Sequence, residues 1–370
     1  MRSRFYLVWA GVAVASWFIP QLVEALGGGI FYLVFLYGLL FWVAQATSWN
    51  MLSGFAGYFS FGQGAFFGAG VYTTAVLSAR LGWPLLAAMA AGAVTAAAIA
   101  AFMGVVVFRL RILKGEIFAL VTLAVAFVLA SVARLVKFID GGQGVSVTSL
   151  RLPEFFGDFS TSVYRAGALV AVLAVGLAAW IQRSRFGLGL SGIRDDEEVA
   201  EGLGVPTFRY KMIILTLSSA LSGLSGALHA LQIGYVTVDD VFNIRVPLFV
   251  ILMSILGGTR HWMGPVVGAA VIHTLTDRLS AFGAENMNQI FLGLLLVVVV
   301  AALREGVYRR LVARRWVVLA TFVATLALLA VTGWGGRLIT QAGIAFGMAI
   351  LVSLLPARLG SPAPAPREVT

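Results

Sequence analysis

Residues 192–211 read GIRDDEEVAEGLGVPTFRYK, and this polar stretch lies between two long apolar segments, 164–182 and 210–232. It contains five of the sixteen acidic residues of the chain. Apolar segments of about 20 residues can cross the hydrocarbon core of a membrane as helices, whereas a dense cluster of charge is costly there. The stretch therefore predicts a connection at one membrane face, between two spanning helices.

The composition of the whole chain agrees with a membrane protein. Of its 370 residues, 60% are hydrophobic and 11% are charged, and the mean hydropathy is +0.95. A soluble domain is about half apolar and about a quarter charged. The sequence has no cysteine, which excludes disulfides and cysteine nucleophiles, and its three scattered histidines do not predict a metal centre. We therefore expect an all-α integral membrane protein, a polytopic helical bundle of about 10–12 transmembrane segments.

Twelve apolar segments are candidates for the spanning helices. They are 7–25, 30–49, 62–79, 84–108, 115–136, 164–182, 210–232, 245–258, 264–281, 288–303, 316–333 and 338–355. Glycine-rich stretches border 62–79 and 245–258, so we expect these two to be broken or re-entrant. The N-terminal region 1–29 is expected to stay as a first spanning helix, because its apolar run is long and many more follow.

The distribution of Lys and Arg predicts the orientation of the helices. If all twelve segments cross and the N-terminus is cytoplasmic, eighteen of the 26 basic residues fall on the cytoplasmic side and eight on the other. Cytoplasmic loops of membrane proteins carry such an excess. We therefore expect both termini and residues 192–209 in the cytoplasm, and loops 138–163 and 234–243 outside.

The acidic stretch itself predicts one short helix over residues 194–203. Acids in its first turn suit the positive end of the helix dipole, Val199, Ala200 and Leu203 form a small apolar patch, and glycines end the helix. So short a helix is marginal in water, so we expect it to dock on a partner; the alternative is a solvated loop that orients its neighbours. The expected docking residues are Arg194, Asp195, Asp196, Glu197, Glu198, Val199, Ala200, Glu201, Gly202, Leu203 and Gly204.

The glycine-rich stretch GYFSFGQG (57–64) predicts a break in a helix. Backbone groups freed at membrane depth are tolerated where protein or a water-lined path satisfies them, and a polar solute can pass at such a place. The alternative is that the small residues only let helices approach closely. The candidate residues for lining a substrate pathway are Gly57, Tyr58, Ser60, Gly62, Gln63 and Gly64.

Five stretches together resemble a known family. Residues 197–205, EEVAEGLGV, are similar to the coupling loop of ABC-importer permeases. Within that group the chain resembles the branched-chain amino-acid permeases of the LivM type, over residues 30–312, with Ile117, Asp140 and Arg260 departing from the usual residues. The stretches are NMLSGFAGYFSFGQGAFFGAGVYTTAVL (50–77), LRILKGEIFALVTLA (110–124), DGGQGV (140–145), residues 183–228, and ILGGTRHWMGPVVGAAVI (255–272).

The resemblance implies a transport subunit of a bacterial inner (plasma) membrane, without an ATPase site of its own. It implies two cytoplasmic ATPase subunits that bind ATP and Mg, a second related permease, an external solute-binding protein, and import of branched-chain or other hydrophobic amino acids. No G-x-x-x-x-G-K-[ST] phosphate loop occurs in the sequence. Residues 313–355 would add two helices to the family core, and 356–370, rich in Pro and Ala, would be a disordered tail.

Three other interpretations stay open. The same machine could carry urea, a short amide or an aromatic acid. An ion-coupled secondary transporter would work without ATP. A polytopic membrane enzyme would need convergent Asp, His or Arg side chains at one face, whereas the four acids at 195–198 are consecutive and spread around a helix.

Overall fold

A computed structural model describes residues 2–25, 27–109, 115–148 and 150–281. The expected segments 288–303, 316–333 and 338–355 and the expected tail 356–370 lie outside these residues. The helices are α1 (Arg2–Trp17), α2 (Ile19–Ala25), α3 (Ile30–Ser53), α4 (Gln63–Ala79), α5 (Leu85–Arg109), α6 (Glu116–Leu135), α7 (Phe159–Gln182), α8 (Arg185–Asp195), α9 (Glu197–Gly202), α10 (Thr207–Ile233), α11 (Val238–Val241), α12 (Arg245–Gly257) and α13 (Met263–Ala281).

The expected all-α, multi-pass architecture is confirmed. Seven stretches of the described part are long and apolar enough to cross a membrane as helices. The two segments expected to be irregular are short as single helices: α4 has 17 residues and α12 has 13, the latter preceded by the four-residue α11. Both are shorter than the roughly 20 residues that a spanning helix needs, so each depends on adjoining chain to complete a crossing.

The short helix α4 lies inside the bundle and packs against α5, α6 and α10. Fourteen of its residues are buried, including every residue from Gln63 to Tyr72. A side chain at Gly70 would collide with the carbonyl of Gly223 on α10, and one at Gly226 would collide with the carbonyl of Phe67. Small residues thus bring the helix backbones into contact.

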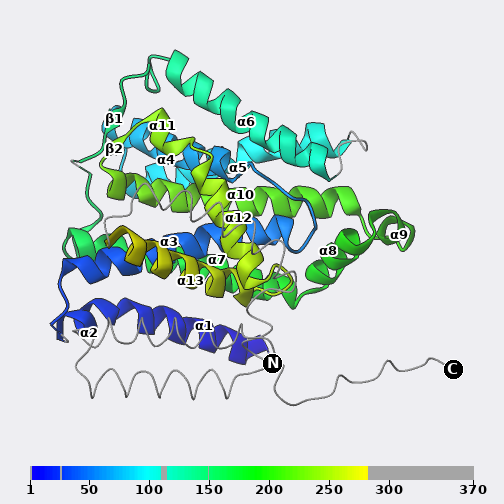
Figure 1. Ribbon diagram of the computed structural model, residues 1–370, viewed down its shortest axis with the longest axis horizontal. Helices are drawn as coiled ribbons and strands as arrows, with labels where there is room; N and C mark the ends of the chain where they lie inside the picture. The colour runs from blue at the N-terminus through cyan, green and yellow to red at the C-terminus, as the bar shows by residue number, and fades with distance from the viewer. Residues whose placement is uncertain (1, 26, 110–114, 149, 282–370) are drawn as a thin grey trace. The chain divides into compact units, whose positions relative to one another are not determined.

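The two ends of the bundle are built differently (Figure 1). Helices α8 and α9 project at one end, which we call the α9 face; the connection between α3 and α4 (residues 54–62) and the connection between α12 and α13 (residues 258–262) belong to it as well. At the opposite end, the sheet face, β1 (Val145–Ser146) and β2 (Tyr235–Val236) pair antiparallel.

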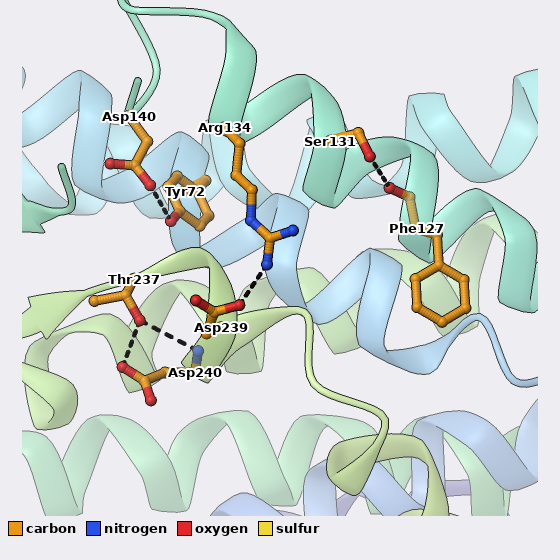
Figure 2. Close-up of polar contacts among 8 residues, drawn as sticks. All are labelled: Tyr72, Phe127, Ser131, Arg134, Asp140, Thr237, Asp239 and Asp240. Atoms are coloured by element: carbon orange, nitrogen blue, oxygen red, sulfur yellow. Dashed lines mark hydrogen bonds and ion pairs between the residues drawn. The ribbon is translucent and has the colours of Figure 1, made fainter. Parts of the chain in front are cut away.

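On the sheet face, two loops distant in sequence hold each other in place (Figure 2). The Asp140 carboxylate accepts hydrogen bonds from the backbone N–H of Gly144 and, at 2.9 Å, from the hydroxyl of Tyr72 on α4. Arg134, in the last turn of α6, forms an ion pair with Asp239 on α11. The loop that follows α6 is therefore tied both to α4 and to the β2–α11 segment.

The contact between α4 and α10 generates a prediction about stability. The substitution Gly70→Ala places a methyl group against the Gly223 carbonyl, and overpacking of this kind costs about 1–3 kcal/mol. We expect a lower melting temperature for this variant, measured by thermal unfolding of the detergent-purified protein. Gly11→Ala on α1, where nothing lies within 4 Å of the added carbon, is the control and should melt like the wild type; equal melting temperatures for both variants would contradict the packing.

Candidate functional site

The acidic stretch forms two helices rather than one. Helix α8 ends at Asp195, and Asp196 has extended backbone angles (φ −159°, ψ 112°). Its Oδ1 accepts hydrogen bonds from the backbone N–H groups of Glu198 at 2.9 Å and Val199 at 3.0 Å. The prediction of one helix over 194–203 is therefore wrong at its start: Asp196 caps a new helix, and Arg194 and Asp195 belong to the last turn of α8.

The C-terminal end of α9 follows the stop signals in the sequence. Gly204 adopts a positive φ of +86°, and the N–H of Val205 bonds to the carbonyl of Ala200 at 3.0 Å. A glycine in the left-handed region is the common way to end a helix, because other residues are strained there. Helix α9 is thus closed at both ends by hydrogen bonds of its own, which compensates for its length of six residues.

The apolar side chains of this stretch point in two directions. Ala200 is buried and packs toward Gly192 on α8. Val199 and Leu203 are 58% and 81% exposed; we call these two side chains the α9 surface. The acids Asp195, Asp196, Glu198 and Glu201 are exposed around it. The expected apolar patch is therefore split: Ala200 holds α9 to the bundle, whereas Val199 and Leu203 are uncovered.

The 54–62 connection, which contains four of the six residues expected to line a pathway, begins beside the expected docking residues. Arg194 Nη1 donates a hydrogen bond to the carbonyl of Gly54 at 3.0 Å. Gly57, with φ +78°, lies directly against the Arg194 side chain: an added Cβ would be 2.7 Å from Arg194 Cγ. The two predicted sites therefore adjoin at the α9 face, which their spacing in the sequence did not indicate.

A buried charged cluster joins the same elements. Lys211 Nζ, in the first turn of α10, donates to Glu197 Oε1 at 2.5 Å and to the Tyr58 hydroxyl at 3.1 Å, and that hydroxyl donates to the other oxygen of Glu197. The Lys211 and Glu197 side chains are 7% and 14% exposed. Burial, followed by the hydrogen bond that the hydroxyl donates to Glu197, raises the pKa of Tyr58, so the hydroxyl stays protonated. The sequence patterns did not indicate a role for Lys211. The feature that could have done so is a lone Lys near the start of an apolar helix.

Gln63, the first residue of α4, lies at the centre of a second, uncharged polar cluster. Its Nε2 donates to Gln45 Oε1 at 2.8 Å and to Ser48 Oγ at 2.7 Å, both on α3. Ser222 of α10 donates to the same Gln45 oxygen at 2.9 Å. All four side chains are buried. The sequence pointed to Gln63 but missed the other three members of the cluster, although Gln45 and Ser48 are one helical turn apart.

Unpaired polar atoms continue along α3 and α10. The hydroxyls of Thr47 and Ser219 and both amide atoms of Asn50 are buried and have no hydrogen-bond partner among the described residues. Asn50 lies beside Gly54 and Thr259, at the α9 face. A buried polar group without a partner costs about 1–3 kcal/mol, so several in one region point to a function there.

The remaining expected pathway residues shape the turn between α3 and α4. Ser60 Oγ accepts from the N–H of Gly62 at 3.0 Å, and the Ser60 carbonyl accepts from Trp49 Nε1 at 2.7 Å. Gly64 is buried, and a Cβ on it would meet Pro247 of α12 at 3.4 Å. These residues position the start of α4, and their polar atoms are occupied within the turn.

The 258–262 connection is fastened to the end of α7. Gln182 Nε2 donates to the carbonyl of Arg260 at 2.7 Å, and its Oε1 accepts from the N–H of Trp262 at 3.0 Å. His261 Nδ1 accepts from the N–H of Met263 at 3.1 Å. Partial burial, followed by the charge of Arg183, lowers the pKa of His261, so its ring is neutral at pH 7 and serves as this acceptor. The α9 face is thus a connected set of loops.

Comparison with known proteins identifies the family of the chain. A family model described as branched-chain amino acid transport system / permease component matches residues 26–300. The permease protein LivM of Escherichia coli K12, from a high-affinity branched-chain amino acid transport system, is 25% identical over 83% of this chain and 75% of its own length. The probable branched-chain amino acid permease LivH of Methanocaldococcus jannaschii is 23% identical over 48% of this chain and 56% of its own.

Other relatives are named for different solutes. The fructose import permease FrcC of Rhizobium meliloti is 29% identical over 40% of this chain and 44% of its own length. No solved structure matches. Because the family model covers most of the chain, from the first glycines before α3 to beyond α13, this protein belongs to the branched-chain amino acid transport system permease family of ABC importers.

Proposed function

We propose that this chain is a membrane-spanning subunit of an importer for branched-chain and other hydrophobic amino acids, driven by separate ATPase subunits that dock on the α9 surface. The observation that carries the proposal is the exposure of Val199 and Leu203 on a helix that is otherwise capped, closed and packed against α8. Uncovered apolar side chains on a rigid element outside the spanning helices are typical of a protein–protein contact. The surrounding acids favour a partner with a basic rim.

The proposed orientation puts the α9 face in the cytoplasm. The excess of Lys and Arg expected on the side of residues 192–209 supports it, since basic residues are retained on the cytoplasmic side. In a bacterial inner membrane, both termini would lie on that side. The sheet face would then be external and would receive the solute-binding protein, and the contacts between its loops would make it a firm platform.

The proposed substrate route follows the buried polar groups of α3, α4 and α10. It starts at the cluster of Gln63, Gln45 and Ser222 and continues past Thr47 to Asn50 at the α9 face. Neutral polar side chains can exchange hydrogen bonds with a zwitterion and release it, because they form no ion pair that must later be broken. Rocking of the helices around this strip would open it alternately to each side.

The substrate class rests on the relatives. The similarity to the Escherichia coli LivM extends over 83% of the chain, whereas that to the fructose permease extends over 40%. A second, related permease subunit and two ATPase subunits would complete the membrane complex. A route of neutral groups would also accept urea, a short amide or an aromatic acid, so the solute-binding protein would select the solute.

Affinity purification from the native membrane in mild detergent, with mass spectrometry of the associated chains, tests the proposal. We expect two ATPase subunits and a second permease, and ATP-dependent amino-acid uptake after reconstitution with the solute-binding protein. Recovery of the chain alone, together with uptake that needs an ion gradient and no ATP, would overturn it.

Removing the α9 surface should detach the ATPase. The double substitution Val199→Ser and Leu203→Ser deletes the exposed apolar contact, and losing a central contact of an interface costs about 2 kcal/mol or more. We expect the affinity for the ATPase subunit, measured by surface plasmon resonance in detergent, to fall by at least about tenfold. Phe155→Ser, an exposed apolar residue at the sheet face, is the matched control and should bind normally. Unchanged binding by the double variant would exclude α9 as the dock.

Making the proposed route apolar should slow uptake without loosening the fold. Thr47→Val and Asn50→Leu replace groups that have no partner among the described residues, so no hydrogen bond is lost and the melting temperature should hold or rise. Each substitution loses about 1 kcal/mol of contact with a passing polar solute, so we expect uptake by the complex with the double variant to fall roughly thirtyfold. Thr95→Val on α5, whose hydroxyl bonds within its own helix, is the control; full uptake by the double variant would contradict the route.

A further inference from the structure

The buried cluster of Lys211, Glu197 and Tyr58 needs an explanation beyond stability. Desolvation of two opposite charges roughly cancels their attraction, so a buried ion pair is commonly no more stabilising than apolar side chains of the same volume. This pair is enclosed by aromatic rings: Lys211 Nζ lies 5.1 Å from the Tyr58 ring centre and 5.0 Å from that of Phe108 on α5. A strong, directional, water-shielded contact at this place joins elements more firmly than apolar packing, which tolerates sliding.

The three residues come from three elements of the α9 face. Glu197 is the first residue of α9, Lys211 is in the first turn of α10, and Tyr58 is in the 54–62 connection. The Tyr58 ring packs edge-on against Phe108 and Phe118, with ring centres 5.3 and 5.2 Å away. The Tyr58 hydroxyl is therefore bonded to the charged pair while its ring packs against α5 and α6. A displacement of Glu197 would thus move the 54–62 connection.

A second contact joins the 54–62 connection to the acidic segment around α9. Arg194, two residues before the α9 cap, holds the Gly54 carbonyl. The connection is thus held by hydrogen bonds at Gly54 and at Tyr58. Gly57 lies between them in a backbone conformation that favours glycine. Two points of attachment on one short segment transmit both translation and rotation of α9 to the connection, whereas a single hydrogen bond would act as a pivot.

The gripped segment leads directly to the proposed route. Five residues after Tyr58, Gln63 begins α4 and makes the hydrogen bonds that join α4 to α3. The turn between them is stiffened by Ser60, through Trp49 and Gly62. A movement of α9 that pulls Tyr58 therefore acts on the N-terminus of α4, where a small rotation separates Gln63 from Gln45 and Ser48.

We propose that Glu197, Lys211 and Tyr58 form a latch that transmits the displacement of α9 to the N-terminus of α4 and so couples ATP-driven movement to opening of the route. The three act as positioning residues: they touch neither the solute nor the nucleotide. The inference rests on the proposed function, because it takes α9 to be the docking site of the ATPase. The partner chemistry it requires is a rigid subunit that moves α9 as a body.

The test compares transport with ATP consumption in the complete complex, reconstituted in liposomes with its solute-binding protein. Tyr58→Phe removes one hydroxyl and keeps the ring contacts. Glu197→Gln with Lys211→Met neutralises the pair together, so that no buried charge is left alone. We expect the number of amino acids imported per ATP hydrolysed to fall about threefold in the first variant and at least tenfold in the second, with the ATPase subunits still bound.

Two controls separate a latch from a merely structural cluster. Tyr164→Phe removes a buried tyrosine hydroxyl on α7, outside the cluster, and should keep the wild-type ratio. Lys211→Arg keeps a cation able to bond both partners and should keep most of the coupling, whereas Lys211→Met alone should not. If import and ATP hydrolysis fall in parallel in the Tyr58→Phe and double variants, so that the ratio is constant, the latch is overturned.

A reversible cross-link gives a second measurement that does not depend on removing charges. The chain has no cysteine, so Gly57→Cys with Arg194→Cys creates one possible disulfide, at a place where a β-carbon added to residue 57 would lie 3.2 Å from that of residue 194, just below the usual disulfide spacing. In the Tyr58→Phe background, we expect oxidation to restore coupling and reductant to remove it. Equal ratios in both states would overturn the latch. If the wild-type complex contained no ATPase, the proposed function would be overturned and the latch with it. Failure of the latch alone differs, because the wild-type complex would then still contain the ATPase.

Discussion

The direct contact of helix backbones at Gly70 and Gly223 is the constraint on which the rest of the structure depends. Helix α4 is too short to cross a membrane alone and begins with an amide side chain, so it can exist at that depth only where other helices cover it. The glycines let α5 and α10 close around it. Without that enclosure, the hydrogen bonds of Gln63 to α3 would face lipid and the preceding turn would have no support.

Enclosure of α4 also bears on where the polar groups of the bundle lie. Neutral groups gather where α3, α4 and α10 meet, whereas buried charges lie toward the two ends, with the Lys211–Glu197 pair at the α9 face and Asp140 at the sheet face. Charges deep in the bundle would have to be stripped of water at each crossing, whereas hydroxyls and amides can exchange partners. The division suits a subunit that passes a small polar solute and receives its driving force from outside the membrane.

The geometry of the α9 face resolves how so short a helix can carry force. Asp196 caps its start, Gly204 closes its end, and Ala200 seats it on α8. Glu197 then connects it to α10 and to the 54–62 connection. Each contact is modest, but together they leave α9 little freedom to move independently of the bundle, while Val199 and Leu203 remain uncovered.

Much of the fold could be predicted from the sequence, because the length and hydropathy of a spanning helix are local properties. The nine expected segments within the described residues coincide with helices, and the glycine stop at residue 204 and the interruption before Gln63 were visible as composition. Family membership followed from short motifs in order. From the same motifs the sequence proposed a candidate site in two stretches, residues 57–64 and 194–204, and the structure brings these stretches together at the α9 face.

Only the tertiary structure decided how those stretches act. Whether Asp196 would continue a helix or cap a new one depends on where its carboxylate points, and which of Val199 and Ala200 would be covered depends on the angle between α8 and α9. The bond between Tyr58 and Glu197 joins residues 139 positions apart, and Lys211 bonds to Glu197 and Tyr58, which are 14 and 153 positions away. Such contacts arise from packing of whole helices, which no local pattern of residues encodes.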